Sequence, residues 1–239
     1  MSLVVIAHRG ASGTAPENTL AAFRRAADIG AHMLELDVQL TADGAVVVIH
    51  DETLERTTEG TGPVEGLTLA ELRRLDAGGW FDERFRGEQI PTLAEVLAAV
   101  SLPINVELKA PATAELAERT VRIVMESGAL GRVVFSSFHP DLLRAARGYA
   151  PTADLAVLWS EPSISDALRL AEGVAATALH IRKEAAQAPV IAAARRAGLA
   201  VRVWTVNVRE DARRLAADGA TGIFTDFPDR FLQNVDATA

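Results

Sequence analysis

Short apolar runs rich in β-branched residues alternate along the chain with longer stretches in which apolar residues recur at helical spacing. Such runs, bounded by polar or glycine positions, are typical of buried strands. They predict strands at Leu3–Ala7, Met33–Gln39, Ile104–Leu108, Val133–Ser136, Leu155–Leu158, Ala178–Ile181, Val201–Thr205 and Gly222–Thr225. Helical patterns follow most of them, at Ala112–Glu126, Pro140–Arg147, Ser163–Ala171, Glu184–Ala197 and Arg209–Ala217, and an earlier helix is expected from Asn18 to Gly30.

This alternation predicts a parallel sheet whose strands are joined by crossover helices, an α/β fold. Eight strands favour a closed (β/α)8 TIM barrel over the alternative, an open doubly wound sheet. No GxGxxG pattern follows the first strand, which argues against a dinucleotide-binding version of the open sheet. The length of 239 residues suits a single barrel domain over residues 1–239.

One connection is too short for a parallel crossover. Asp43–Gly44, a strong turn signal, lies between the second strand and the apolar run Val46–Ile49. We therefore predict that Val46–Ile49 folds back antiparallel on Met33–Leu40. A two-residue turn at Asp43–Gly44 would place Asp37 opposite His50, whereas a slip of one residue would turn His50 to the other face.

A glycine-rich segment, residues 51–91, then precedes the next barrel strand. It is predicted to contain one short helix, Leu69–Leu75. Long insertions in compact domains are often lids or binding loops. The alternative is a packed surface subdomain with Trp80, Phe81 and Phe85 as its own small core. The sequence leaves both interpretations open.

Three carboxylates are candidates for a metal site. Glu35 and Asp37 are two positions apart on a predicted strand, so both side chains point to the same face. Two carboxylates held together away from water repel each other, and a divalent cation removes that cost. Glu107 could complete the site, and an all-oxygen ligand set favours Mg²⁺ or Ca²⁺ over zinc. The alternative is a pair of charges at the solvent edge, paired with arginine.

Two histidines are candidates for acid–base chemistry. His8 and His50 each lie next to the end of a predicted strand, and imidazole exchanges protons near neutral pH. In opposite protonation states they could deprotonate a nucleophile and protonate a leaving alkoxide. Arg9 can fork onto phosphate oxygens, and Lys109 can face a phosphate or keep a carboxylate ionised. The set indicates metal-assisted phosphodiester hydrolysis.

Composition narrows the remaining classes of function. The formal net charge is -8, and no Lys/Arg run with interleaved aromatic residues is present, so nucleic acid is not an expected partner. Cysteine is absent, which excludes disulfides, thiolate zinc sites and a cysteine nucleophile. Neither a signal peptide nor an apolar run of membrane-spanning length is evident. We expect a cytoplasmic protein without stable membrane insertion; the oligomeric state, a homo-oligomer included, stays open.

Several motifs occur together, in order, over almost the whole chain. They are His8-Arg9-Gly10, Pro16-Glu17-Asn18-Thr19, Glu35-Leu36-Asp37-Val38, His50-Asp51, Glu107-Leu108-Lys109, Trp204-Thr205-Val206-Asn207 and Thr225-Asp226-Phe227-Pro228. In these motifs the chain resembles the glycerophosphodiester phosphodiesterase family. The resemblance implies a (β/α)8 fold with a small insertion after the His-Asp motif, which residues 51–91 match.

The resemblance also implies an activity, the hydrolysis of glycerophosphodiesters, which are small molecules, to sn-glycerol 3-phosphate and an alcohol. It implies roles for individual residues: metal ligands Glu35, Asp37 and Glu107; acid–base residues His8 and His50; phosphate partners Arg9 and Lys109; Trp204 in the glycerol pocket; and Glu17 and Asn18 in support of the first loop. The same constellation could serve a lysophospholipase D or a phosphoinositide-type phospholipase. A non-catalytic barrel that binds a phosphorylated metabolite is a more remote alternative, because no candidate histidine or carboxylate is missing.

Overall fold

Eight parallel strands close into a barrel in the computed structural model, which describes residues 3–109, 113–161 and 163–232. The strands are β1 (Val4–Ala7), β2 (Met33–Leu40), β4 (Ile104–Leu108), β5 (Val133–Ser137), β6 (Asp154–Trp159), β7 (Ala178–Arg182), β8 (Ala200–Trp204) and β9 (Gly222–Thr225). Each pairs with its neighbour in parallel, and the pairing of β1 with β2 closes the ring. The predicted (β/α)8 barrel is therefore confirmed.

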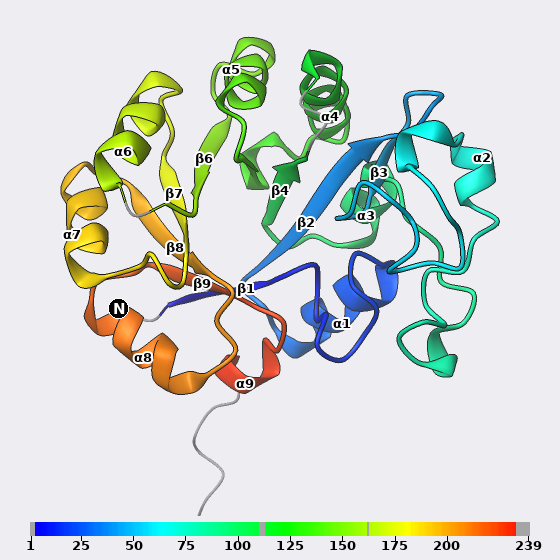
Figure 1. Ribbon diagram of the computed structural model, residues 1–239, viewed down its shortest axis with the longest axis horizontal. Coiled ribbons are helices and arrows are strands. Elements are labelled where there is room, and N and C mark those ends of the chain that lie inside the picture. The colour runs from blue at the N-terminus through cyan, green and yellow to red at the C-terminus, as the bar shows by residue number, and fades with distance from the viewer. Residues whose placement is uncertain (1–2, 110–112, 162, 233–239) are drawn as a thin grey trace, which may run out of the picture.

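Helices form an outer ring around these strands (Figure 1). They are α1 (Leu20–Ile29), α3 (Leu93–Ala99), α4 (Ala114–Glu126), α5 (Pro140–Tyr149), α6 (Ile164–Gly173), α7 (Ala188–Arg196), α8 (Arg209–Ala217) and α9 (Asp229–Leu232). The predicted helices are present with shifted ends, whereas α3 and α9 were not predicted. The expected start of a helix at Ala112 lies outside the described residues, as do Met1–Ser2 and Asn234–Ala239.

The first helix begins later than Asn18, where the sequence pattern placed its start. Asn18 has a left-handed backbone with φ of 57°, which a right-handed helix cannot include. Thr19 is instead the N-cap of α1, and its hydroxyl accepts a hydrogen bond from the Ala22 N–H at 3.3 Å. Gly30 ends the helix in the left-handed conformation, as predicted.

Apolar side chains pack on both sides of the strands. A large cluster fills the layer between strands and helices. A smaller cluster takes one residue from each of six strands around the ring, so it lies inside the barrel: Ile6, Met33, Val134, Ala156, Ala178 and Phe224. Side chains alternate along a strand, so the residues two positions beyond these also face the interior, nearer the carboxyl ends of the strands.

The antiparallel strand β3 (Val46–Val48) pairs with β2 as expected, but its predicted register is wrong by one residue. Val38 lies opposite Val48, and Asp37 opposite Ile49, whose N–H donates to the Asp37 carbonyl at 3.0 Å, not opposite His50. The turn contains three residues, because Thr41 and Ala45 still face each other across it and Gly44 adopts a positive φ of 76°.

The insertion is packed against the barrel rather than free of it. It contains α2 (Leu69–Leu72) and two short 3-10 turns, Val64–Gly66 and Glu83–Phe85. Its core is a separate cluster shared with β3, formed by Val47, Ile49, Leu54, Val64, Leu72, Ala77 and Ile90. The packed alternative placed Trp80, Phe81 and Phe85 in a small core of their own; these rings instead contact one another edge to face outside that cluster, and Trp80 is 42% exposed. Among the described residues, no helix has both the length and the apolar character needed to cross a membrane.

Candidate active site

The residues that the sequence singled out converge at the carboxyl ends of the barrel strands. Strand alternation places His8 above Ile6 and places Glu35 and Asp37 above Met33. A small inner cavity of about 70 Å³ is lined by His8, Arg9, Glu35, His50, Asn105, Glu107, Lys109, Phe138, Leu158, Trp204 and Phe224. In TIM barrels this end of the strands carries the catalytic groups.

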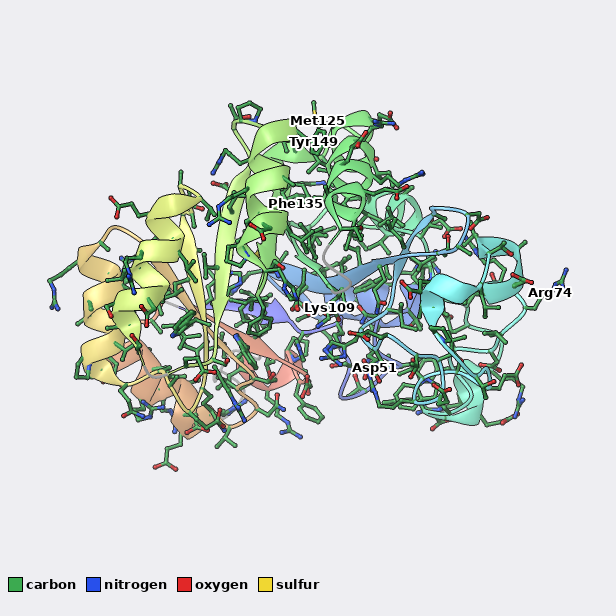
Figure 2. All side chains as sticks on the ribbon, turned by 45° about the horizontal axis from the view of Figure 1, so that its top comes forward. Asp51, Arg74, Lys109, Met125, Phe135 and Tyr149 are labelled. Carbon is green, nitrogen blue, oxygen red and sulfur yellow. The ribbon has the colours of Figure 1, made fainter. Side chains whose placement is uncertain are left out.

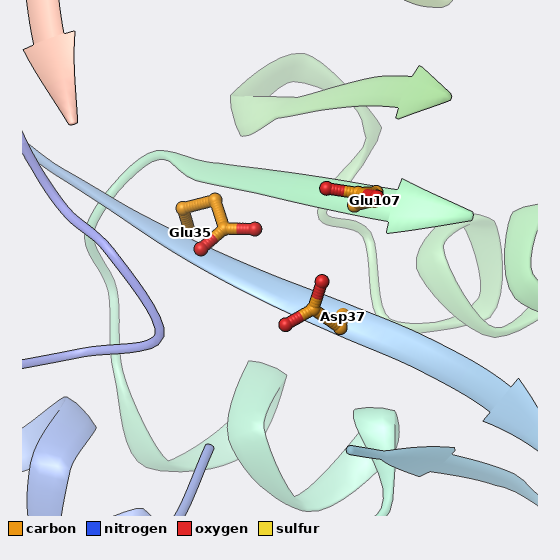
Figure 3. A group of neighbouring side chains, drawn as sticks. All are labelled: Glu35, Asp37 and Glu107. Atoms are coloured by element: carbon orange, nitrogen blue, oxygen red, sulfur yellow. The ribbon is translucent and has the colours of Figure 1, made fainter. Parts of the chain in front are cut away.

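The three candidate metal ligands face one another at this end (Figure 3). Asp37 and Glu107 are register partners on the neighbouring strands β2 and β4, and Glu35 precedes Asp37 on the same face. One carboxylate oxygen from each residue can be chosen so that all lie within 4.8 Å of one another. Glu35 and Asp37 are only 3% and 1% exposed. The three carboxylates are therefore close together in a region that is largely shielded from solvent.

The negative charges of these three carboxylates need a positive counter-charge. Burial and the neighbouring charge of Asp37 raise the pKa of Glu35 to about 8, and the same two causes raise the pKa of Glu107. Burial also opposes ionisation of Asp37, but the charges of Arg9 and Lys109 outweigh it and lower the pKa of Asp37. An oxygen-only donor set with excess negative charge fits a hard divalent cation. The acidic cluster can therefore bind such an ion.

His8 is held by a carboxylate that follows the last barrel strand. Its Nδ1 lies 2.7 Å from Asp226 Oδ1. Asn207 Nδ2 and Ser12 Oγ also donate to Asp226, at 2.7 and 3.1 Å. Burial by itself lowers the pKa of His8, but the hydrogen bond to Asp226 and the charge of Glu35 outweigh it, so the pKa is raised. Because an ionised carboxylate only accepts, Nδ1 carries a proton and Nε2 is left for proton transfer.

His50 is held in the same way, by the carboxylate of the residue that follows it. Its Nδ1 lies 2.6 Å from Asp51 Oδ1. Burial lowers the pKa of His50, and the positive charges of Arg9 and Lys109 lower it further. The negative charge of Asp37 raises the pKa but does not outweigh these effects. The two imidazoles thus present Nε2 under different electrostatic conditions, with the pKa of His8 raised and that of His50 lowered.

A strained turn positions Arg9. Its φ is 55°, in the left-handed region, and the following residue, Gly10, has φ of 82°. A Cβ atom on Gly10 would lie 2.7 Å from the backbone carbon of Ala22 in α1, so only glycine fits. The turn points the Arg9 N–H at Glu35 Oε2, at 2.8 Å, and brings its Nε within 3.4 Å of Asp37 Oδ2.

The residues expected to support the first loop do contact it. Glu17 Oε1 accepts a hydrogen bond from Arg9 Nη1 at 2.7 Å. Asn18 donates from Nδ2 to Asp37 Oδ2 at 2.9 Å, and its N–H donates to the Arg9 carbonyl. The left-handed backbone of Asn18, which delays the helix, is what brings its amide to the carboxylate cluster.

Lys109 and Trp204 complete the lining of the inner cavity. The Lys109 ammonium lies 2.9 Å from Glu107 and 3.7 Å from Asp37. The Trp204 ring meets Phe138 edge to face at 5.8 Å. A second, outer cavity of about 440 Å³ adjoins the first, since both are lined by His50, Glu107, Lys109 and Phe138. Its other lining residues are Asp51, Glu52, Thr53, Leu108 and His139.

Several residues at the site received no role from the sequence. Asp226 and Asn207 belong to motifs that carry the resemblance, but nothing in their spacing links them to His8. Asp51 was read only as part of the His-Asp pair. Arg56, which lies in the insertion and contacts Asp51, carried no signal because its other partner, Glu17, is 39 positions away in sequence. In Figure 2, Asp51 and Lys109 lie near the middle of the molecule, whereas Arg74 lies at the outer end of the insertion.

Comparison with known proteins agrees with this geometry. The model of the glycerophosphoryl diester phosphodiesterase family matches residues 8–230. A glycerophosphodiester phosphodiesterase of Caldanaerobacter subterraneus is 38% identical over 240 residues, which cover 98% of both chains. A solved phosphodiesterase of Oleispira antarctica, in complex with its product sn-glycerol 3-phosphate, has a TM-score of 0.87 and 34% identity over 95% of this chain and 94% of its own. The glycerophosphodiester phosphodiesterase of Agrobacterium tumefaciens has a TM-score of 0.83 and 32% identity, over 97% of this chain and 99% of its own.

Proposed function

Because the chain belongs to the glycerophosphoryl diester phosphodiesterase family, we propose that it hydrolyses glycerophosphodiesters to sn-glycerol 3-phosphate and an alcohol. The product bound in the Oleispira antarctica structure, 34% identical to this chain, supports the same product here. One observation carries the proposal most: three carboxylates converge at the cavity that two histidines line, and a further carboxylate holds the Nδ1 atom of each histidine.

The chemistry needs two proton transfers, and the two histidines can supply them. One histidine removes the proton of the free 2-hydroxyl of the glycerol moiety, and that oxygen attacks phosphorus. The other histidine protonates the oxygen of the leaving alcohol as its bond to phosphorus breaks. A cyclic glycerol phosphate forms, and water opens it with the two roles reversed. Since both rings hold Nδ1 in a hydrogen bond, Nε2 is the atom that moves the proton in each step.

The pKa directions favour one assignment of the two roles. A raised pKa favours the protonated form of His8, which suits the group that protonates the leaving alcohol. A lowered pKa keeps His50 neutral, which suits the group that takes the hydroxyl proton. Arg9 and Lys109 line the same cavity and contribute positive charge toward the phosphate oxygens. Trp204, on the same cavity, would contact the glycerol carbons.

Glu35, Asp37 and Glu107 would hold a divalent cation, Mg²⁺ or Ca²⁺, which would neutralise charge on the phosphate oxygens. The raised pKa of Glu35 supports this, because a cation would allow all three carboxylates to ionise together. The cytoplasmic location stays a prediction.

A substrate series tests the cyclic route. Purified protein is incubated with glycerophosphocholine and with its 2-deoxy analogue, and release of the phosphate product is followed for both. The proposal expects turnover of the first and no measurable turnover of the second, since the attacking hydroxyl is missing. Equal rates would show that water attacks directly, while the hydrolase assignment would stand. His50→Ala should abolish turnover of glycerophosphocholine in the same assay.

A further inference from the structure

Arg56 bonds to two carboxylates that come from different parts of the chain. Its Nε and Nη2 donate to Asp51, at 2.5 and 3.1 Å. Its Nη1 and Nη2 donate to Glu17, at 2.7 and 2.8 Å. All three guanidinium nitrogens are thus engaged, although the side chain is 44% exposed. Arg56 therefore joins the insertion to the loop that follows β1.

Each of these carboxylates also contacts a group of the active site. In both cases one carboxylate oxygen contacts Arg56 and the active-site group at the same time. Asp51 Oδ1 accepts from Arg56 and lies 2.6 Å from His50 Nδ1. Glu17 Oε1 accepts from Arg56 and from Arg9 Nη1, at 2.7 Å. Arg56 is consequently linked through Asp51 to the acid–base residue His50, and through Glu17 to the phosphate partner Arg9.

Without this guanidinium, the two carboxylates would lose their common counter-charge. Glu17 is only 13% exposed, so solvent screens it poorly, and Asp51 would be free to leave the His50 ring. A lysine would keep the charge, but a single ammonium cannot reproduce a fork that bonds two carboxylates at four points. The geometry therefore requires arginine at this position.

We propose that Arg56 is a positioning residue, which holds Asp51 and Glu17 and through them fixes the His50 ring and the Arg9 guanidinium at the inner cavity that both residues line. The inference rests on the proposed phosphodiesterase function, because it assigns Arg56 a part in that turnover. It also gives the insertion a role: its packed core, which includes Leu54 two residues before Arg56, holds the guanidinium in place.

The test compares Arg56→Gln and Arg56→Lys with a matched control, Arg73→Gln. Arg73 is also in the insertion and donates from Nη2 to both oxygens of Glu95 at 2.6 Å, with 31% of its side chain exposed. Neither Arg73 nor Glu95 lines either cavity. Removal of Arg73 thus breaks a comparable ion pair of the insertion at a distance from the chemistry.

Each variant is assayed with glycerophosphocholine at saturating metal, well below its thermal midpoint. Small displacements of catalytic groups cost up to about 100-fold in rate, so we expect kcat to fall about 10- to 100-fold in Arg56→Gln. Arg56→Lys should recover part of this loss, and Arg73→Gln should keep kcat within about twofold of the wild type, because it lies outside the linked groups. The thermal midpoints of Arg56→Gln and Arg73→Gln should be similar.

A double variant tests whether Arg56 acts through Asp51. If it does, Arg56→Gln combined with Asp51→Asn should lower kcat by less than the product of the two separate effects. An Arg56→Gln protein with the kcat of Arg73→Gln, or fully multiplicative losses in the double variant, would overturn the inference. A wild-type protein without activity would instead refute the proposed function, so the two failures are distinct.

Discussion

The stability of the metal-free protein should depend on pH through Glu35. In the folded chain, burial and the charge of Asp37 raise the pKa of Glu35 to about 8, against an ordinary value of 4.5. Between these two values the folded state binds a proton that the unfolded state has released, so the free energy of unfolding falls as pH rises. Below about pH 4.5 this contribution is fully present, and it is lost by about pH 8.

The size of this effect follows from the pKa difference. The two values are about 3.5 pH units apart, and each unit corresponds to about 1.4 kcal/mol, so ionised Glu35 costs the metal-free fold at most roughly 5 kcal/mol. Glu35→Gln cannot ionise, yet its amide oxygen can still accept the Arg9 N–H that now donates to Glu35 at 2.8 Å. The variant should therefore lack this pH dependence while keeping the local hydrogen bond.

Urea unfolding of both proteins in EDTA, from pH 5 to pH 9, measures the difference. Relative to Glu35→Gln, the wild type should lose stability with a slope of up to about 1.4 kcal/mol per pH unit, and saturating Mg²⁺ or Ca²⁺ should restore it. The other titrating groups of the site remain in both proteins, so the difference between the two profiles reports Glu35 together with the groups whose pKa its charge shifts, His8 among them. Parallel pH profiles in EDTA would refute the reasoning, because Glu35 would then ionise as it does in the unfolded chain.

Three further predictions concern the reaction and its groups. Asp226→Asn should move the limb of the pH–rate profile that belongs to His8 to lower pH by about one unit or more, because a charge-assisted hydrogen bond worth about 1.5–3 kcal/mol is lost. If this limb does not move, Asp226 does not set the pKa of His8. Asp37→Asn should raise the metal concentration needed for half-maximal activity at least about tenfold while the thermal midpoint stays within a few degrees; an unchanged metal dependence would remove Asp37 from the ligand set. Glycerophosphocholine should be cleaved much faster than lysophosphatidylcholine, since the inner cavity, which Trp204 lines, holds only about 70 Å³; equal rates would favour a lysophospholipase D.

The barrel could be predicted from the sequence because its parallel strands, buried on both faces, are continuous apolar runs. Helix α3 was missed although Thr92 and Glu95 form a capping box, a signal that precedes an apolar run. The register of β3 depended on whether the turn has two or three residues, and Asp43–Gly44 suits both. A two-residue type I′ turn needs a positive φ at both central residues, whereas of Asp43 and Gly44 only Gly44 has one, and this is a property of the folded backbone.

The candidate site was predictable where its residues share a strand or a motif. Alternation along one strand predicts that Glu35 and Asp37 point to the same face, and Glu107 could be added to them because it lies on the next barrel strand. The hydrogen bond between Asp226 and His8 links the ends of the neighbouring strands β9 and β1. The two residues are 218 positions apart in sequence, so no local pattern encodes their contact. The contact between Arg56 and Glu17 likewise depends on how the insertion folds against the first loop.

One measurement tests the central claim that these residues form a metal-dependent glycerophosphodiester hydrolase. Purified protein is treated with EDTA, Mg²⁺ or Ca²⁺ is then restored, and release of sn-glycerol 3-phosphate from glycerophosphocholine is followed by a coupled enzyme assay. The account predicts no release in EDTA and release after either or both metals are restored. Undiminished release in EDTA would contradict the role of the carboxylate cluster, and no release under any condition would contradict the proposed reaction.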